Sequence, residues 1–133
     1  AINPDKAGLP TEILTVDQLV ALQPNLHRGA RHLRAHLDYP MHEGFGKVIV
    51  TLAIRGKATI VLLSDHDEQP AWRFHLNEGE CYALSGRARN RCLHAVLADD
   101  DGGGERESLN LRFGLHTAEE AEMQVLQFWK GKM

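Results

Sequence analysis

The stretch RAHLDYP at residues 34–40 carries an imidazole and a carboxylate two positions apart, at His36 and Asp38. On a β-strand, residues i and i+2 project from the same face, so these two groups would lie side by side. Such a pair supplies two of the three ligands in the 2-His-1-carboxylate arrangement, which holds a mononuclear metal ion and leaves coordination positions open. A lone His-x-Asp is common by chance, so a third ligand must come from elsewhere in the chain.

His94 is the candidate for the third ligand. It lies in RCLHAVL (91–97), an apolar run that predicts a strand with Cys92, His94 and Val96 on one face. A lone histidine on a strand is also compatible with a purely structural role. A competing pair, His66 and Glu68, falls in the polar stretch SDHDEQP, which predicts a solvated loop.

In the stretch RESLNLR (106–112), alternate residues define two faces of the predicted strand, one of them polar. Its polar face holds Arg106, Ser108, Asn110 and Arg112. One interpretation is an amphipathic strand with a solvated outer face. The other is that two guanidiniums, six residues apart, line a cavity, where their planar forks would suit a dicarboxylate ligand.

The elements that must position these groups are mostly short strands. Residues 1–10 read as an irregular lead-in, and TVDQLVALQP predicts a short helix with Thr15 as N-cap, Gln18 in the capping box and Pro24 as its end. Gly56-Lys57 and Asn77-Glu78-Gly79 predict turns, the first a hairpin. A final helix is expected after Thr117, with Glu120 in the capping-box position. The expected strands are 47–55, 58–64, 71–76, 80–84, 91–97 and 106–115.

With the strand that would carry His36 and Asp38, this makes about seven strands bracketed by two helices, which favours a small sandwich or barrel over alternating βαβ units. We expect one domain over residues 1–133, a length that can bury a single core. The polar loop at 99–105 lacks the ligand spacing of an EF-hand, so a plain connection is expected there.

Charge and cysteine content narrow the function classes. The net charge of −3 does not favour nucleic acid or an anionic membrane as the partner. Two basic runs, at 28–34 and 87–91, are interpreted as solvated edges or turns. Two cysteines without a CxxC motif indicate a reduced, soluble intracellular protein, in cytoplasm, nucleus or an organelle. There is no apolar run of membrane-spanning length and no signal-peptide pattern, and the start at Ala1 suggests a processed form or an excised domain.

Taken in order, these residues resemble the AlkB-type Fe(II)/2-oxoglutarate-dependent dioxygenases. The family pattern runs Asn-x-Tyr, His-x-Asp, a distal His after a glycine turn, and Arg-x5-Arg. NLHRGARHLRAHLD places Asn25 eleven residues before His36, GECYALSGRARNRCLHAV ends near His94, and RESLNLR supplies the arginine pair. The resemblance covers a core of about residues 25–115.

The resemblance implies a mostly β fold, a double-stranded β-helix or jelly-roll barrel of two facing sheets. It implies Fe(II) held by His36, Asp38 and His94, with 2-oxoglutarate and molecular oxygen as co-substrates. The activity implied is hydroxylation or oxidative demethylation, releasing succinate and carbon dioxide. The co-substrate contacts implied are Asn25, His27, Arg106, Ser108, Asn110 and Arg112, with Arg112 binding either a co-substrate carboxylate or a neighbouring acid.

The sequence departs from the family in three places. His27 stands where the family has tyrosine, and Tyr39-Pro40 follow Asp38 in place of a second acid that some nucleobase-repair members use. Only 24 residues precede Asn25 in this sequence, so we expect it to lack the usual N-terminal nucleotide-recognition lid. The candidate substrates are a modified nucleobase, a protein side chain or a small metabolite, and a further domain or partner would supply recognition. The alternatives are a cupin-like metal-binding barrel (isomerase, lyase or binding protein), in which the arginine pair is dispensable, and a non-catalytic interaction module.

Overall fold

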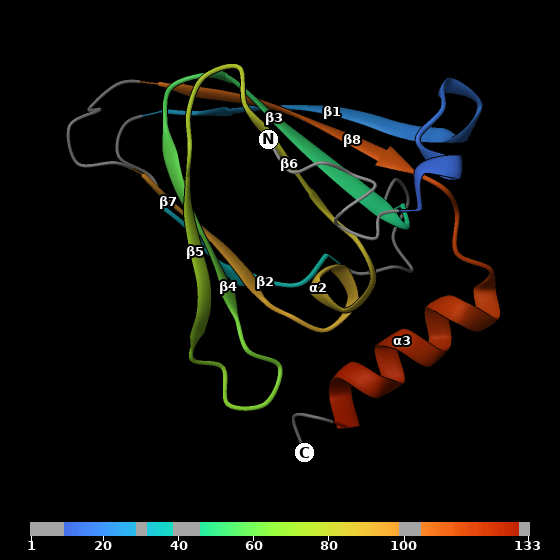
Figure 1. Cartoon of the computed structure of the whole chain (residues 1–133). Helices are drawn as coiled ribbons and strands as arrows, with labels where there is room; N and C mark the ends of the chain where they lie inside the picture. The colour runs from blue at the N-terminus through green and yellow to red at the C-terminus, as the bar shows by residue number, and fades with distance from the viewer. Residues whose placement is uncertain (1–9, 29–31, 39–45, 99–104, 131–133) are drawn as a thin grey trace.

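Two four-stranded antiparallel sheets face each other in the computed structural model, which describes residues 10–28, 32–38, 46–98 and 105–130 (Figure 1). The first sheet has the order β1-β8-β3-β6 and the second has the order β2-β7-β4-β5. The strands are β1 (Leu19–His27), β2 (Leu33–His36), β3 (Val48–Arg55), β4 (Ala58–Leu63), β5 (Pro70–Leu76), β6 (Cys81–Leu84), β7 (His94–Ala98) and β8 (Arg106–Phe113). The helices are α2 (Gly86–Asn90) and α3 (Ala118–Lys130), and two short 3-10 turns, η1 (Thr11–Ile13) and η2 (Val16–Gln18), precede β1.

The connections between strands make this a jelly roll, as expected. Strand β3 lies in the first sheet and β4 in the second, and the chain crosses again between β5 and β6 and between β7 and β8. The prediction of a hairpin at Gly56-Lys57 is therefore wrong, although the turn itself is present with a φ of 83° at Gly56. Only β4 and β5 pair as sequence neighbours among the described strands. Each crossing brings residues from distant parts of the sequence to opposite walls of one interior.

The predicted N-terminal helix is wrong. Thr15 makes no side-chain capping bond, η2 ends at Gln18, and the residues that follow form β1 through Pro24 to His27. Strand β1 pairs with β8 alone, so it lies at the edge of its sheet, where a proline without an N–H is tolerated. Pairing with β8 along nearly its whole length outweighs the local helical pattern.

The region 85–97 also differs from its prediction. The strand expected over 91–97 begins only at His94, and residues Gly86 to Asn90 form α2, which the sequence pattern did not indicate. The C-terminal helix is confirmed: α3 begins at Ala118, and the backbone N–H of Glu120 donates to Thr117 Oγ1 at 3.1 Å.

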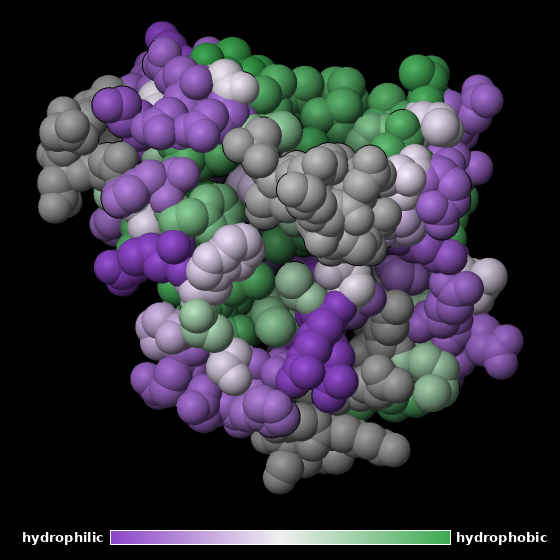
Figure 2. Space-filling model, in the orientation of Figure 1, coloured by the Kyte–Doolittle hydropathy of each residue, from purple (hydrophilic) through white to green (hydrophobic). Residues whose placement is uncertain are grey.

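The apolar core lies between the sheets towards β4 and β6. Its buried members include Ile60, Leu62 and Leu84, with Tyr82 packed edge-on against Phe74 at a ring-centroid distance of 5.4 Å. Apolar side chains are also found outside the barrel. Figure 2, in the orientation of Figure 1, shows them along the top of the molecule, over the sheet that contains β1 and β8.

Three expectations fall largely outside the described residues: the lead-in at 1–10, the polar loop at 99–105 and the Tyr39-Pro40 pair. Among the residues that are described, no helix has the length and apolar character to cross a membrane.

Candidate functional site

The three predicted ligands come together at one end of the interior. His36 ends β2 and His94 begins β7, and these residues face each other in the β2–β7 ladder with ring centroids 4.2 Å apart. Asp38 follows two residues after His36. The strand expected to carry both residues stops at His36, so Asp38 lies just beyond it. One ligand atom from each residue can be chosen so that all three lie within 4.8 Å of one another.

Hydrogen bonds orient the first imidazole for ligation. His36 Nδ1 lies 2.7 Å from the carbonyl oxygen of Arg34, which fixes Nδ1 as the donor in the neutral ring. Nε2 then carries the lone pair, and it lies 3.3 Å from Asp38 Oδ1. A backbone carbonyl behind a histidine is the usual support of a metal-bound imidazole, because it fixes the tautomer and the ring orientation.

The carboxylate of Asp38 is divided between two neighbours. Arg112 Nη2 donates to Oδ2 at 3.1 Å, while Oδ1 faces His36. The two side chains of this ion pair are only 11% and 19% exposed. Arg112 thus has a neighbouring acid as its partner, and Asp38 keeps one oxygen on the side of the two imidazoles.

Burial and neighbouring groups set the protonation of the three candidate ligands. Burial lowers the pKa of His94 to about 4, so this imidazole is neutral at neutral pH. Burial opposes ionisation of Asp38, but the hydrogen bond from His36 and the charge of Arg112 outweigh it and hold its pKa well below the ordinary value. The pKa of His36 is raised, because Nε2 of its protonated ring donates to Asp38, and a metal ion at Nε2 would take the place of that proton. Two imidazoles and one carboxylate therefore fit a divalent ion with open coordination positions.

A cavity of about 240 Å³ opens beside these ligands. The polar face of β8 lines this cavity, so the interpretation of a solvated outer face is wrong, and the dicarboxylate ligand stays a prediction. Asn25 lies opposite Ser108, and His27 opposite Arg106, in the β1–β8 ladder. Nine residues predicted for the site line this one cavity: Asn25, His27, His36, Asp38, His94, Arg106, Ser108, Asn110 and Arg112.

The sequence pattern missed part of the cavity wall. Thr51 on β3 donates to Asn110 Oδ1 at 2.8 Å, and Tyr82 lies opposite Thr51 in the β3–β6 ladder. Burial raises the pKa of Tyr82, although its hydrogen bond with Thr51 works in the other direction. The alternation in ECYAL puts Tyr82 and Leu84 on one face, but nothing in the sequence says that this face turns to the same cavity as the polar face of β8.

The basic run at 87–91 is only partly a solvated surface, which corrects its interpretation. Arg87 and Arg91 are half-exposed, but Arg89 is 1% exposed and is the largest fully buried side chain among the described residues. In the other run, Arg28 and Arg34 are exposed as expected. His66 is also exposed, on the β4–β5 loop, in agreement with its prediction.

No family model and no curated protein matches the sequence. Solved structures match in fold: oxalate decarboxylase of Bacillus subtilis, a structure with Mn(II) centres, has a TM-score of 0.55 at 16% identity and covers 77% of this chain and 24% of its own. CapF bound to an inhibitor gives 0.55 at 9% identity, covering 78% and 27%. The CENP-C cupin domain of Drosophila melanogaster gives 0.51 at 10% identity, covering 68% and 59%.

The fold and the site together define a jelly-roll barrel, similar in fold to a cupin domain, with a His-Asp-His group that could hold a metal ion in its cavity. The chain spans less than two thirds of the length of these structures. They include an enzyme, the oxalate decarboxylase, and also the CENP-C cupin domain. The likeness is therefore one of fold, and proteins of different function share it.

Proposed function

We propose that this chain is the core of an Fe(II)- and 2-oxoglutarate-dependent dioxygenase. His36, Asp38 and His94 hold the metal ion, and Arg106 binds the distal carboxylate of 2-oxoglutarate. The observation that carries the proposal is the position of Arg106 and Arg112 on the same cavity-facing side of β8, beside the three ligands. Arg112 is already the partner of Asp38. A site that binds only a metal ion has no evident use for Arg106, the second arginine on the same face of β8.

The two arginines have different tasks. Arg112 is engaged by Asp38 and holds the carboxylate so that one oxygen is left for the metal ion. Arg106, six residues away at the other end of β8, is the guanidinium assigned to the distal carboxylate. Asn25 and His27 stand opposite Ser108 and Arg106 and add hydrogen-bonding groups at that end, with His27 in place of a tyrosine.

The remaining wall residues keep the cavity narrow and partly apolar. The ring of Tyr82 packs against Phe74 and closes one side, and Ile49 and Ile60 line the same space. When bound, the metal supplies oxygen activation, which couples oxidative decarboxylation of 2-oxoglutarate to succinate and carbon dioxide with insertion of the second oxygen atom into a substrate C–H bond. On an N-methyl group this hydroxylation ends in demethylation.

A second candidate is a cupin-like barrel that uses its metal ion without a 2-oxo acid. It is favoured by the fold match to an oxalate decarboxylase whose structure concerns Mn(II) centres. The two candidates differ in what they need from Arg106: the dioxygenase requires it for co-substrate binding, and the second candidate does not.

The test is an anaerobic titration of the metal-free protein with Fe(II) and then with 2-oxoglutarate, followed by the visible charge-transfer band of the chelate. We expect a band in the parent protein, no band in His36→Ala, and a band that needs at least tenfold more 2-oxoglutarate in Arg106→Met, as for loss of about 1.4 kcal/mol or more of charge-assisted hydrogen bonding. Arg73→Met, an exposed arginine on β5 that does not line the cavity, is the matched control. Metal binding without a band favours the second candidate, and no metal binding favours a non-catalytic interaction module.

A further inference from the structure

Asp38 is the one candidate ligand that no strand ladder positions. His36 and His94 are registered by the β2–β7 pairing, but Asp38 lies beyond the end of β2. Its carboxylate is held by Arg112, and its backbone must be held by something else if the oxygen is to stay within reach of both imidazoles. The structure supplies that contact from α2.

Arg89 makes the contact. Its Nη1 donates to the carbonyl oxygen of Asp38, and its Nε donates to the carbonyl oxygen of Gly46 at 3.2 Å. Gly46 stands just before β3 in the first sheet, while Asp38 follows β2 in the second. A single guanidinium therefore bridges backbone from both walls of the barrel, and it does so five residues before His94 in the sequence.

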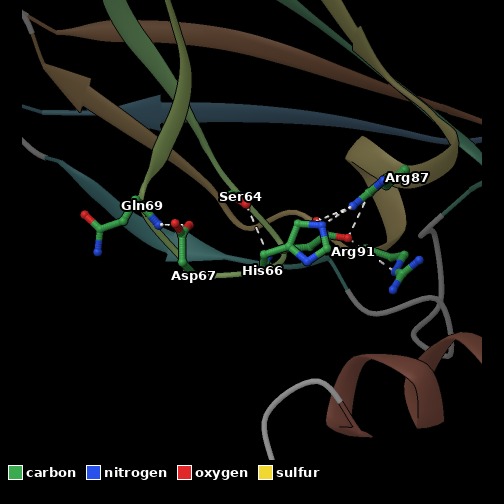
Figure 3. Close-up of polar contacts among 7 residues, drawn as sticks. Ser64, His66, Asp67, Gln69, Arg87 and Arg91 are labelled. Atoms are coloured by element: carbon green, nitrogen blue, oxygen red, sulfur yellow. Dashed lines mark hydrogen bonds and ion pairs between the residues drawn. The ribbon is translucent and has the colours of Figure 1, made fainter.

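The Arg89 side chain and those of Arg87 and Arg91 project to opposite sides of α2. Arg87 and Arg91 turn outward to the β4–β5 loop, where Asp65 accepts from Arg87 Nε at 2.9 Å and from Arg87 Nη2 at 2.7 Å (Figure 3). Arg91 Nε lies 3.5 Å from the same carboxylate. Arg89 lies on the other side of α2, where it points inward and is buried.

We propose that Arg89 is a positioning residue of the metal centre, which fixes the backbone of Asp38 so that its carboxylate meets His36 and His94. This inference rests on the proposed function. Burying a guanidinium is unfavourable unless its N–H groups donate hydrogen bonds. Arg89 donates two, to the carbonyl oxygens of Asp38 and Gly46. Contacts of this kind, one step behind a metal ligand, typically change metal affinity by about 10- to 100-fold when they are removed.

The experiment compares Arg89→Met and Arg89→Lys with Arg87→Met as the matched control on the same helix. Co(II) binding to the metal-free protein is measured by the ligand-field absorption, far-UV circular dichroism checks folding, and the carbonyl ¹³C resonances of Asp38 and Gly46 are recorded without metal. We expect Co(II) to bind about 10- to 100-fold more weakly to Arg89→Met, about 3- to 10-fold more weakly to Arg89→Lys, which keeps a cation but lacks the fork, and within twofold of the parent for Arg87→Met.

Folded Arg89→Met with parent-like Co(II) affinity overturns the proposal. If that variant does not fold, Arg89→Lys decides: parent-like affinity overturns the proposal and weakened affinity supports it. If the parent itself binds no Co(II), the proposed function fails, and the two carbonyl resonances then decide separately. A shift of both in the Arg89 variants supports the positioning of Asp38, and unchanged resonances overturn it.

Discussion

Removal of Arg112 is the sharpest test of the electrostatic description of the centre. Arg112→Met keeps much of the side-chain stem and deletes the guanidinium that lies 3.1 Å from Asp38 Oδ2. Losing one partner of a buried ion pair destabilises a protein by about 3–5 kcal/mol, because the other charge is left uncompensated. Asp38 still has His36 Nε2 at 3.3 Å from its other oxygen and is 19% exposed. We therefore expect a smaller loss, of about 2–3 kcal/mol.

The assay is urea and thermal unfolding of the metal-free protein at neutral pH. An unfolding entropy of about 2.1 cal/mol/K per residue over 133 residues corresponds to about 3.6 °C per kcal/mol, so Tm should fall by roughly 7–11 °C. The control is Arg55→Met, whose ion pair with Glu105 is 49% and 42% exposed and should contribute less than about 1 kcal/mol. Equal losses in the two variants, or a loss below about 1 kcal/mol for Arg112→Met, would refute the reasoning.

Three further predictions follow from the same structure. Asp38→Ala should lower the affinity for Co(II) at least about 100-fold in isothermal titration, and unchanged affinity would place the metal elsewhere. The side chain of His116 is only 3% exposed, and burial lowers its pKa below 6.5. The unfolded chain therefore takes up this proton at a higher pH than the folded protein, and the free energy of unfolding should fall as the pH drops from about 7.5 to 5.5. In His116→Asn, chemical unfolding at both pH values should show a smaller fall in the free energy of unfolding. A fall identical to that of the parent protein contradicts the assignment to His116. Gly46→Ala should destabilise by about 2–4 kcal/mol, because φ is 68° and the new Cβ would lie 2.9 Å from Arg112 Cβ. Gly79→Ala, with φ of 81° and open space, should lose only about 1 kcal/mol in the same denaturation experiment.

The sequence by itself determined what is local. The alternation of RESLNLR fixed which side chains of β8 share a face, because successive strand residues point to opposite sides. The capping pattern at Thr117 fixed the start of α3, since the bond involves residues three apart in the chain. The residue types of the candidate ligands and their order along the chain were also legible.

Tertiary structure decided the rest. Alternation does not say which face of a strand points inward, and only the crossing of the chain between two sheets turned the polar face of β8 towards the cavity. A helical pattern at 15–24 gave way to β1, because pairing with β8 satisfies the backbone of nearly the whole segment. The burial of Arg89 in an otherwise exposed basic run depended on two carbonyls that are far from it in the sequence. Local periodicity carries no information about such distant partners, so the position of Asp38 became explicable only in three dimensions.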